Sequence, residues 1–214
     1  MYQKLVSIQV GKPKKSAGKN GNIFESGIFK NKIDVPVYAK RLNLVGDAQS
    51  DLKNHGGIDK AVNVYPSEHY RYFMEKYSLE LSGGAFGENF TTEGLIENSV
   101  YIGDIFQIGG AVFQVSQPRQ PCWKLSARWM EKLDRIFVQS GKTGWYFRVI
   151  DEGTVQQNSL IKLVERKSDW SIQKVNDIFY HSHNRDELNL LAECPYISEN
   201  WRISIKKKAD KIPA

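Results

Sequence analysis

The amino-acid sequence predicts a mostly β fold with added α-helix, of the α+β class: a distorted β-barrel over residues 1–165 and a small three-helix domain over residues 166–214. Short β-rich segments, separated by turn residues, recur through the first part, and several strands around one core indicate a barrel. They do not alternate regularly with helices, which argues against a doubly wound nucleotide-binding fold. After residue 168 the apolar residues take up helical spacing.

The strands are expected where β-branched and aromatic residues gather between turn residues. These segments are residues 5–10, 61–65, 101–108, 111–115, 145–150 and 159–164. Gly109-Gly110 separates two of them and predicts a tight hairpin. Residues 22–30 and 34–39 are expected to pair with each other as another hairpin.

Four of the expected helices lie outside the central part of the chain. Pro66 opens the first, which carries Tyr70 and Phe73 on one face. Ser171 and Ser198 are the expected N-caps of two helices in the tail, and a short helix lies between them. The three tail helices are expected to pack on the barrel or on another subunit, so a homodimer is one alternative.

A further helix is expected to begin at Pro121, with Cys122 in its first turn. Its apolar face is formed by Cys122, Leu125, Trp129, Leu133 and Ile136, and Gly141 is the expected stop. Unpaired N–H groups at the helix start, with Arg119 and Lys124 nearby, favour the thiolate form of Cys122. A thiolate can act as a nucleophile, a redox centre or a soft metal ligand. The alternative is that Cys122 is a small buried apolar residue.

Composition and charge limit the classes of partner. The net charge of +6 leaves room for nucleic acid or a phosphorylated small molecule, and lysines gather in residues 12–19 and 206–211. No helix-turn-helix, zinc-finger or RNP pattern indicates sequence-specific nucleic-acid binding. No apolar run reaches the roughly 20 residues of a membrane helix. The two cysteines do not form a disulfide framework, so we expect a reducing, cytoplasmic location.

Two glycine-containing segments can approach a ligand closely. His55-Gly56-Gly57 forms a turn beside a histidine that can carry protons, because its intrinsic pKa lies near neutrality. Residues 83–94 are rich in glycine and threonine, which can surround phosphate oxygens, but they lack the ending of a P-loop. Arg119 and Arg148 can each bind phosphate through a forked pair of hydrogen bonds. A plain turn, a surface loop and two surface arginines are the simpler alternatives.

Three segments taken together resemble one known family. They are His55-Gly56-Gly57-Ile58-Asp59-Lys60-Ala61-Val62, Phe86-Gly87-Glu88-Asn89-Phe90 and Gln117-Pro118-Arg119-Gln120-Pro121-Cys122-Trp123-Lys124-Leu125. In this order they resemble the MOSC domain, and the match is closest to its YiiM-like branch, in which a small helical domain follows. The resemblance covers nearly the whole chain. It implies a distorted, mostly antiparallel β-barrel that binds molybdenum cofactor, a pterin dithiolene with a phosphate.

The resemblance also implies roles for particular residues. The family's characteristic cysteine falls on Cys122, which is then the expected molybdenum ligand and catalytic residue. His55 and Asp59 are the preferred residues for moving protons, with Glu88 as a further candidate. The expected donors and polar contacts for the cofactor are Lys60, Glu88, Asn89, Thr91, Arg119 and Arg148.

The implied activity is a molybdenum-dependent reduction of N-hydroxylated bases, such as 6-N-hydroxylaminopurine, which detoxifies them. The sequence has no cysteine set for an iron–sulfur cluster and no dinucleotide fingerprint, so electrons are expected from separate electron-transfer proteins. One alternative is a sulfur carrier or cofactor-handling protein with a persulfide on Cys122, which would work without an attached pyridoxal-phosphate domain. Another is a binding module for nucleic acid that uses the basic surface.

Overall fold

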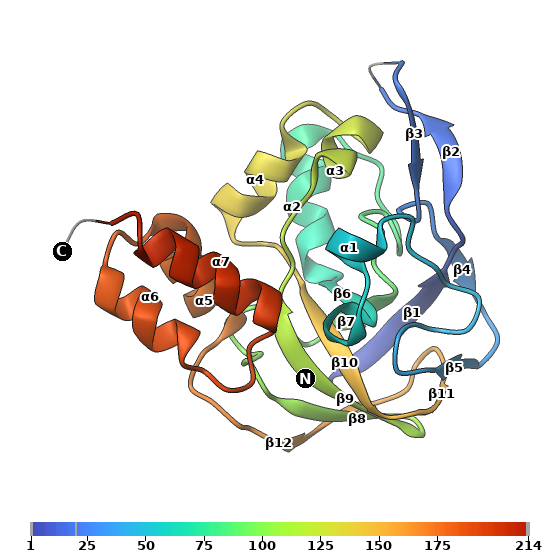
Figure 1. Cartoon of the computed structure of the whole chain (residues 1–214). Coiled ribbons are helices and arrows are strands. Elements are labelled where there is room, and N and C mark those ends of the chain that lie inside the picture. Colours follow the sequence, from blue (N-terminus) through green and yellow to red (C-terminus); the bar gives the residue numbers. More distant parts are fainter. Residues whose placement is uncertain (1, 20, 213–214) are drawn as a thin grey trace.

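The computed structural model describes residues 2–19 and 21–212. The large sheet and the β2–β3 hairpin fill one part of the molecule, and three helices form a cluster beside the sheet (Figure 1). The strands are β1 (Lys4–Val10), β2 (Lys14–Ala17), β3 (Ile23–Ser26), β4 (Asn31–Ile33), β5 (Val37–Ala39), β6 (Val62–Pro66), β7 (Phe90–Glu93), β8 (Ile105–Ile108), β9 (Ala111–Pro118), β10 (Trp145–Asp151), β11 (Gly153–Val155) and β12 (Ile161–Glu165). The helices are α1 (Leu52–His55), α2 (Glu68–Tyr77), α3 (Trp123–Arg128), α4 (Leu133–Ser140), α5 (Ile172–His181), α6 (Arg185–Ala192) and α7 (Glu199–Ala209), with a 3-10 turn at Ile58–Lys60.

The main sheet is curled but not closed. Its strand order is β12-β8-β9-β10-β6-β7-β1-β4, and its pairs are antiparallel except for the parallel pair of β6 and β7. The start of β1 reaches the far edge, because the N–H of Leu5 donates to the carbonyl oxygen of Ser159 at 2.9 Å. Since β12 and β4 remain at the two ends of the order, the expected barrel is only approximate. The α+β class and the helical C-terminal domain are confirmed.

Most expected strands are present, including the hairpin at Gly109-Gly110, where Ile108 lies opposite Ala111. The expected pairing of residues 22–30 with residues 34–39 is wrong. Instead β3 pairs with β2, β4 with β1, and β5 with the distant β11. Alternating apolar residues identify a strand, but they do not select its partner when several edges are free. The β2–β3 hairpin therefore takes up part of the lysine-rich segment and projects from the molecule (Figure 1).

The central helix is divided in the structure, which corrects the expected single helix from Pro121. Cys122 is the N-cap of α3, and the chain then turns through Lys132, whose φ of 66° ends helical continuity before α4. Tertiary hydrogen bonds hold the end of α3 in place. The guanidinium of Arg128 donates to the carbonyl oxygen of Ile28 at 2.6 Å, and the indole N–H of Trp129 donates to that of Ala85 at 2.7 Å.

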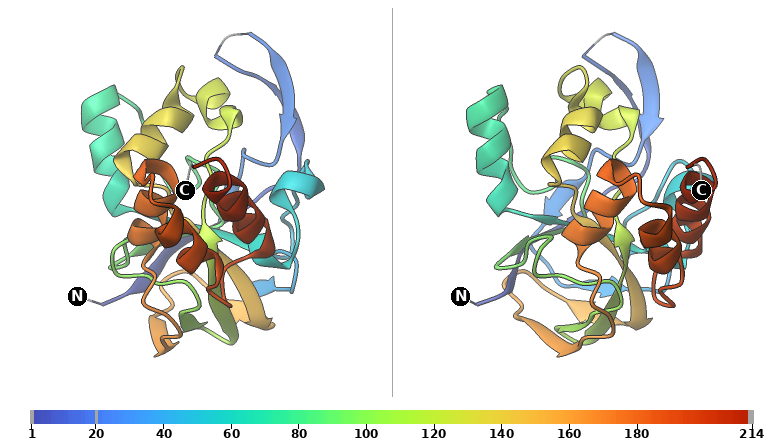
Figure 2. Two further views of the ribbon diagram at one scale, coloured as in Figure 1. Left: turned by 60° about the vertical axis from the view of Figure 1, so that its left-hand side comes forward. Right: turned by 90° about the vertical axis from the view of Figure 1, so that its left-hand side faces the viewer.

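The C-terminal helices confirm the expected caps. The Ser171 side chain accepts the N–H of Lys174 at the start of α5, and the Ser198 side chain accepts that of Trp201 at the start of α7. Trp201 is fully buried, so α5, α6 and α7 form one cluster that packs beside the sheet (Figure 2). Within the described residues, no helix combines the length and the apolar character of a membrane span.

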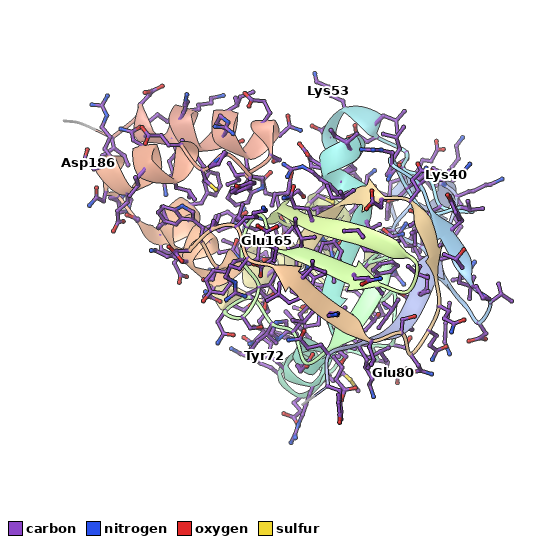
Figure 3. All side chains as sticks on the ribbon, turned by 90° about the horizontal axis from the view of Figure 1, so that it is seen from below. Lys40, Lys53, Tyr72, Glu80, Glu165 and Asp186 are labelled. Carbon is purple, nitrogen blue, oxygen red and sulfur yellow. The ribbon has the colours of Figure 1, made fainter. Side chains whose placement is uncertain are left out.

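Side chains extend from both faces of the curled sheet (Figure 3). A large apolar cluster joins the sheet to the helical domain, and Trp145, Phe147 and Trp201 are among its fully buried members. A second cluster, built around Tyr65, Phe86 and Phe137, lies under α2, α3 and α4. Beside α1, polar side chains from β-strands and loops line two cavities.

Candidate functional site

Two connected cavities open beside Cys122. The inner cavity is lined by Lys30, Asp47, Asn63, Asn89, Arg119 and neighbouring residues, and it has about 630 Å³ of space when the solvent-open space at its mouth is included. The outer cavity has about 1280 Å³ counted in the same way, and it is lined by residues of α1, of the 117–124 segment and of α7. The residues common to both are His55, Lys60, Gln120, Cys122, Lys124 and Tyr146. A molecule in either cavity can therefore reach the same sulfur atom.

Cys122 is half-buried, free of any disulfide, and lies at the junction of the cavities. Its backbone is extended, with φ of −117° and ψ of 161°, and its carbonyl oxygen accepts the N–H of Leu125 at 3.0 Å. Because α3 has only six residues, its dipole is small. Basic side chains, among them Lys60, Arg119 and Lys124, line the same cavity as the thiol.

Basic groups outnumber acidic ones in the wall of the inner cavity. Lys30, Lys60, Arg119 and Lys124 line it, and Asp47 is the acidic residue among the lining side chains. Asp47 forms an ion pair with Lys30, and it also accepts from the amide of Asn89 at 2.9 Å. Burial lowers the pKa of Lys30 from its ordinary value, although Asp47 opposes this shift. This charge excess favours an anionic ligand.

Arg119 has unused hydrogen-bonding capacity. Its side chain is buried, with 5% of the residue exposed, and its Nη2 donates to the carbonyl oxygen of Phe86 at 2.5 Å. Its Nη1 is also buried and finds no partner among the described residues. A buried guanidinium nitrogen without a partner is costly, and an oxyanion in the inner cavity is the ligand that would satisfy it.

His55 ends α1 and faces both cavities. Gly57 follows with φ of 97°, a conformation that glycine adopts readily, so the expected tight turn is confirmed. Burial lowers the pKa of His55 below its ordinary value, and the charge of Lys60 lowers it further. The imidazole is therefore neutral near pH 7 and able to accept a proton.

We expect the proton titration of His55, followed by NMR, to have its midpoint below the ordinary histidine value of about 6.5. Lys60→Gln should raise the midpoint towards that value, because one neighbouring positive charge is removed. Lys40→Gln is the control, since Lys40 is exposed (Figure 3) and lines neither cavity. A midpoint above the ordinary value would contradict the expected burial of the imidazole.

The same shift has a consequence for stability. The unfolded chain binds a proton at His55 more readily than the folded chain does, because the folded pKa is the lower one. The contribution of His55 to the free energy of unfolding therefore rises with pH between the folded pKa and about 6.5. This contribution is lost as the pH falls through the same interval.

Tyr146 is a site residue that the sequence reasoning missed. It lies on β10 between the fully buried Trp145 and Phe147, opposite Gln117 of β9. Strand alternation directs it away from the core, and this signal was available in the sequence. Burial raises the pKa of Tyr146, so its hydroxyl keeps its proton at neutral pH. Lys30 and Asp47 were also missed, because a single lysine and a single aspartate in loops carry no recognisable pattern.

Asp59 and Arg148 do not line either cavity. They form an ion pair with each other, and the Nη1 of Arg148 donates to the carbonyl oxygen of Tyr196 at 2.9 Å. The pair therefore joins the sheet to the segment that leads into α7. For direct contact with a molecule at Cys122, both side chains would have to leave these partners.

Glu88 and Thr91 also lie behind the cavity wall. The carboxylate of Glu88 accepts the N–H groups of Gly84 at 2.7 Å and Phe86 at 3.0 Å. It also accepts the hydroxyl of Tyr70, and Thr91 lies beside it. The cavity wall instead contains Lys60, Asn89 and Arg119 from the expected set, together with His55 and Cys122. Within residues 2–19 and 21–212, no group of three or more His, Cys, Asp or Glu side chains is placed to hold a metal ion.

Two family models match successive parts of the chain. The MOSC domain model matches residues 51–162, and the model of the YiiM-like, 3-alpha helix domain matches residues 170–208. Protein YiiM of Escherichia coli is 37% identical over 188 residues, which cover 86% of this chain and 84% of that protein. A protein named Reductase from Gibberella moniliformis is 34% identical over 197 residues, which cover 89% of this chain but 34% of that longer protein.

Among solved structures, YiiM from Geobacillus stearothermophilus superposes with a TM-score of 0.80 at 37% identity, covering 97% of this chain and 99% of that one. The match extends over both the curled sheet and the C-terminal helices. Cys122, Lys60, Arg119 and Lys124 lie in the region matched by the first family model, whereas Lys30 and Asp47 of the inner cavity precede it. The chain belongs to the MOSC domain family, in the YiiM-like branch with a C-terminal three-helix domain.

Proposed function

We propose that this protein is a molybdenum cofactor-dependent reductase of N-hydroxylated bases and related compounds, such as 6-N-hydroxylaminopurine. The observation that carries the proposal is the free Cys122 thiol at the junction of two cavities, one of which has a basic wall. Membership of the MOSC family supports it, as does a relative that is named a reductase.

The residues of the inner cavity fit the cofactor. Cys122 offers a soft sulfur ligand of the kind that suits molybdenum. The unpaired Nη1 of Arg119, with Lys60 and Lys124, suits a phosphate group. The Oδ1 of Asn63 is buried and has no partner among the described residues, so it can accept an N–H of the pterin.

When bound, the cofactor supplies the electron chemistry of the reaction. Reduction of N–OH to N–H also consumes two protons and releases water. His55, held neutral by burial, can accept a proton from solvent and pass it on. The hydroxyl of Tyr146 retains its proton and can donate a hydrogen bond to a substrate beside Cys122. Electrons would come from a separate electron-transfer protein.

The proposal is tested with the full chain produced in a host that makes molybdenum cofactor. We expect elemental analysis to find molybdenum in the purified protein. We also expect it to reduce 6-N-hydroxylaminopurine to adenine when an electron donor is supplied. Protein that contains neither metal nor pterin and converts no N-hydroxylated compound would overturn the proposal.

We expect Arg119→Gln to weaken retention of the cofactor by about 10- to 100-fold, the effect of losing a charge-assisted hydrogen bond. Stability should change little, because the lost bond to Phe86 is offset by removal of a buried charge with an unused donor. Pterin and molybdenum content after dilution and gel filtration measures the first effect, and urea unfolding the second. Arg135→Gln, at an exposed position of α4, is the control. Unchanged cofactor content in Arg119→Gln would remove this residue from the binding site.

A further inference from the structure

The outer cavity has one wall that the MOSC domain does not supply. Asn200, Ile203 and Ser204 of α7 line it. Ile203 and Ser204 follow Asn200 by three and four residues, so each lies beside Asn200 on the helix surface. Residues that hold α7 against the domain core occupy the other side, where Trp201 and Ile205 are fully buried. The cavity face of α7 is thus not used for packing within the helical domain.

The position of this wall is fixed relative to Cys122. The N–H of Ser198, immediately before α7, donates to the carbonyl oxygen of Ser116 on β9 at 3.0 Å. Ser116 in turn donates through its hydroxyl to the carbonyl oxygen of Asp59 at 2.6 Å. The contact of Arg148 with Tyr196 adds a second attachment. These bonds connect the start of α7 to the strand that leads directly into the Cys122 segment.

The outer cavity also contains an unsatisfied buried acceptor. Gln117 lines this cavity with 1% of the residue exposed, and its Oε1 has no partner among the described residues. Its amide nitrogen donates a long hydrogen bond, 3.4 Å, to the carbonyl oxygen of Pro118. A buried amide oxygen without a donor is costly. A ligand with an N–H group would satisfy it.

Apolar surfaces accompany this acceptor. Ile203 is 56% exposed although it is aliphatic, and Trp123 is 56% exposed beside Cys122. Tyr146 adds a further ring to the same cavity. The rest of the wall is mostly polar or charged, with Asp51, Lys53, Lys60 and Lys124 among its residues. The apolar surface is therefore largely confined to Trp123, Tyr146 and Ile203, and their two rings together with the Gln117 acceptor suit a flat ligand with an N–H edge.

We infer that the outer cavity is the substrate site and that α7, through Asn200, Ile203 and Ser204, determines which substrates fit. This inference rests on the proposed function for the reaction, but the site itself does not require it. The helical domain then has a direct role in specificity. The cofactor occupies the inner cavity, and Cys122 lies between the two.

Ile203→Trp tests the inference, because the larger side chain fills space between α7 and Cys122. Adenine is the probe, and its binding to the cofactor-free full chain is followed by NMR and calorimetry. We expect at least about 10-fold weaker binding in Ile203→Trp, as is common when a pocket is obstructed. Ile203→Ala, which adds no bulk, should bind adenine and accept larger bases. The control is Leu190→Trp, since Leu190 is an aliphatic residue of α6 with 58% exposure that does not line the cavity.

The loaded enzyme gives an independent readout. Ile203→Trp should keep its molybdenum, lose kcat/KM for 6-N-hydroxylaminopurine, and retain it for the much smaller N-hydroxyurea. Equal adenine binding by wild type and Ile203→Trp, or no binding by wild type, would overturn the inference. The inference would also be overturned if Ile203→Trp lost its molybdenum while wild type and Leu190→Trp kept theirs, because the cofactor would then occupy the outer cavity. If wild type lacks reductase activity but adenine binding depends on Ile203, the proposed function fails and the site stands.

Discussion

Cys122→Ser is expected to lose the bound molybdenum and to reduce 6-N-hydroxylaminopurine at no more than the background rate. Serine occupies nearly the same volume, but its hydroxyl is a hard oxygen donor that stays protonated at neutral pH. Loss of residues that merely orient metal ligands costs about 10- to 100-fold in metal affinity, so loss of a ligand should cost at least as much. Elemental analysis, pterin content and the reductase assay measure the result.

Cys194→Ala is the matched control for this change. Cys194 is the second free cysteine, and it is buried in the apolar cluster beside the C-terminal helices, away from both cavities. Its loss should lower stability modestly and leave the molybdenum content unchanged. If Cys122→Ser retains molybdenum and activity equal to those of Cys194→Ala, then the thiol is neither ligand nor catalyst. Mass spectrometry of wild type then decides whether Cys122 carries a persulfide instead.

Local sequence pattern predicted the strands and caps well, because these depend on neighbouring residues. Ser171 and Ser198 cap helices as expected, and Gly109-Gly110 turns a hairpin. Partner choice was not predictable in the same way. The strand β5 pairs with β11, more than one hundred residues later, and nothing within either segment specifies the other.

The candidate site was likewise predictable where it depends on local sequence and not where it depends on the tertiary fold. Cys122, His55 and Lys60 were identified because each lies in a short segment with an unusual local pattern, and all three line both cavities. Lys30 and Asp47 reach the inner cavity only through the tertiary fold. The role of α7 could not be predicted either, since the sequence distance between Cys122 and Ile203 gives no sign that they share a cavity.

The glycine-rich segment of residues 83–94 shows why composition alone can misdirect. Freed N–H groups in such a loop can bind a phosphate, and the sequence left this open beside a plain surface loop. In the structure the N–H groups of Gly84 and Phe86 are taken by the carboxylate of Glu88 from the same loop. The loop thus satisfies its own donors, and it presents Phe86, Gly87 and Asn89 to the inner cavity. Glu88 therefore fixes one side of the site from behind.

Glu88→Ala is consequently expected to lower the free energy of unfolding by about 3–5 kcal/mol, because two backbone N–H groups and the Tyr70 hydroxyl lose a fully buried partner. A domain of ordinary stability has about 5–15 kcal/mol in total, so the variant should be partly unfolded or strongly heat-sensitive. Tyr70→Phe removes one of the four donors, the fourth being the Thr91 hydroxyl at 3.4 Å, and should cost only about 1 kcal/mol. In the double variant the two costs should not add, since the bond removed by the second change is already gone. Urea unfolding of the four proteins measures this coupling. If the free energy of unfolding of Glu88→Ala is within about 1 kcal/mol of the wild-type value, then the N–H groups of Gly84 and Phe86 find other acceptors. The wall of the inner cavity would then not depend on this carboxylate.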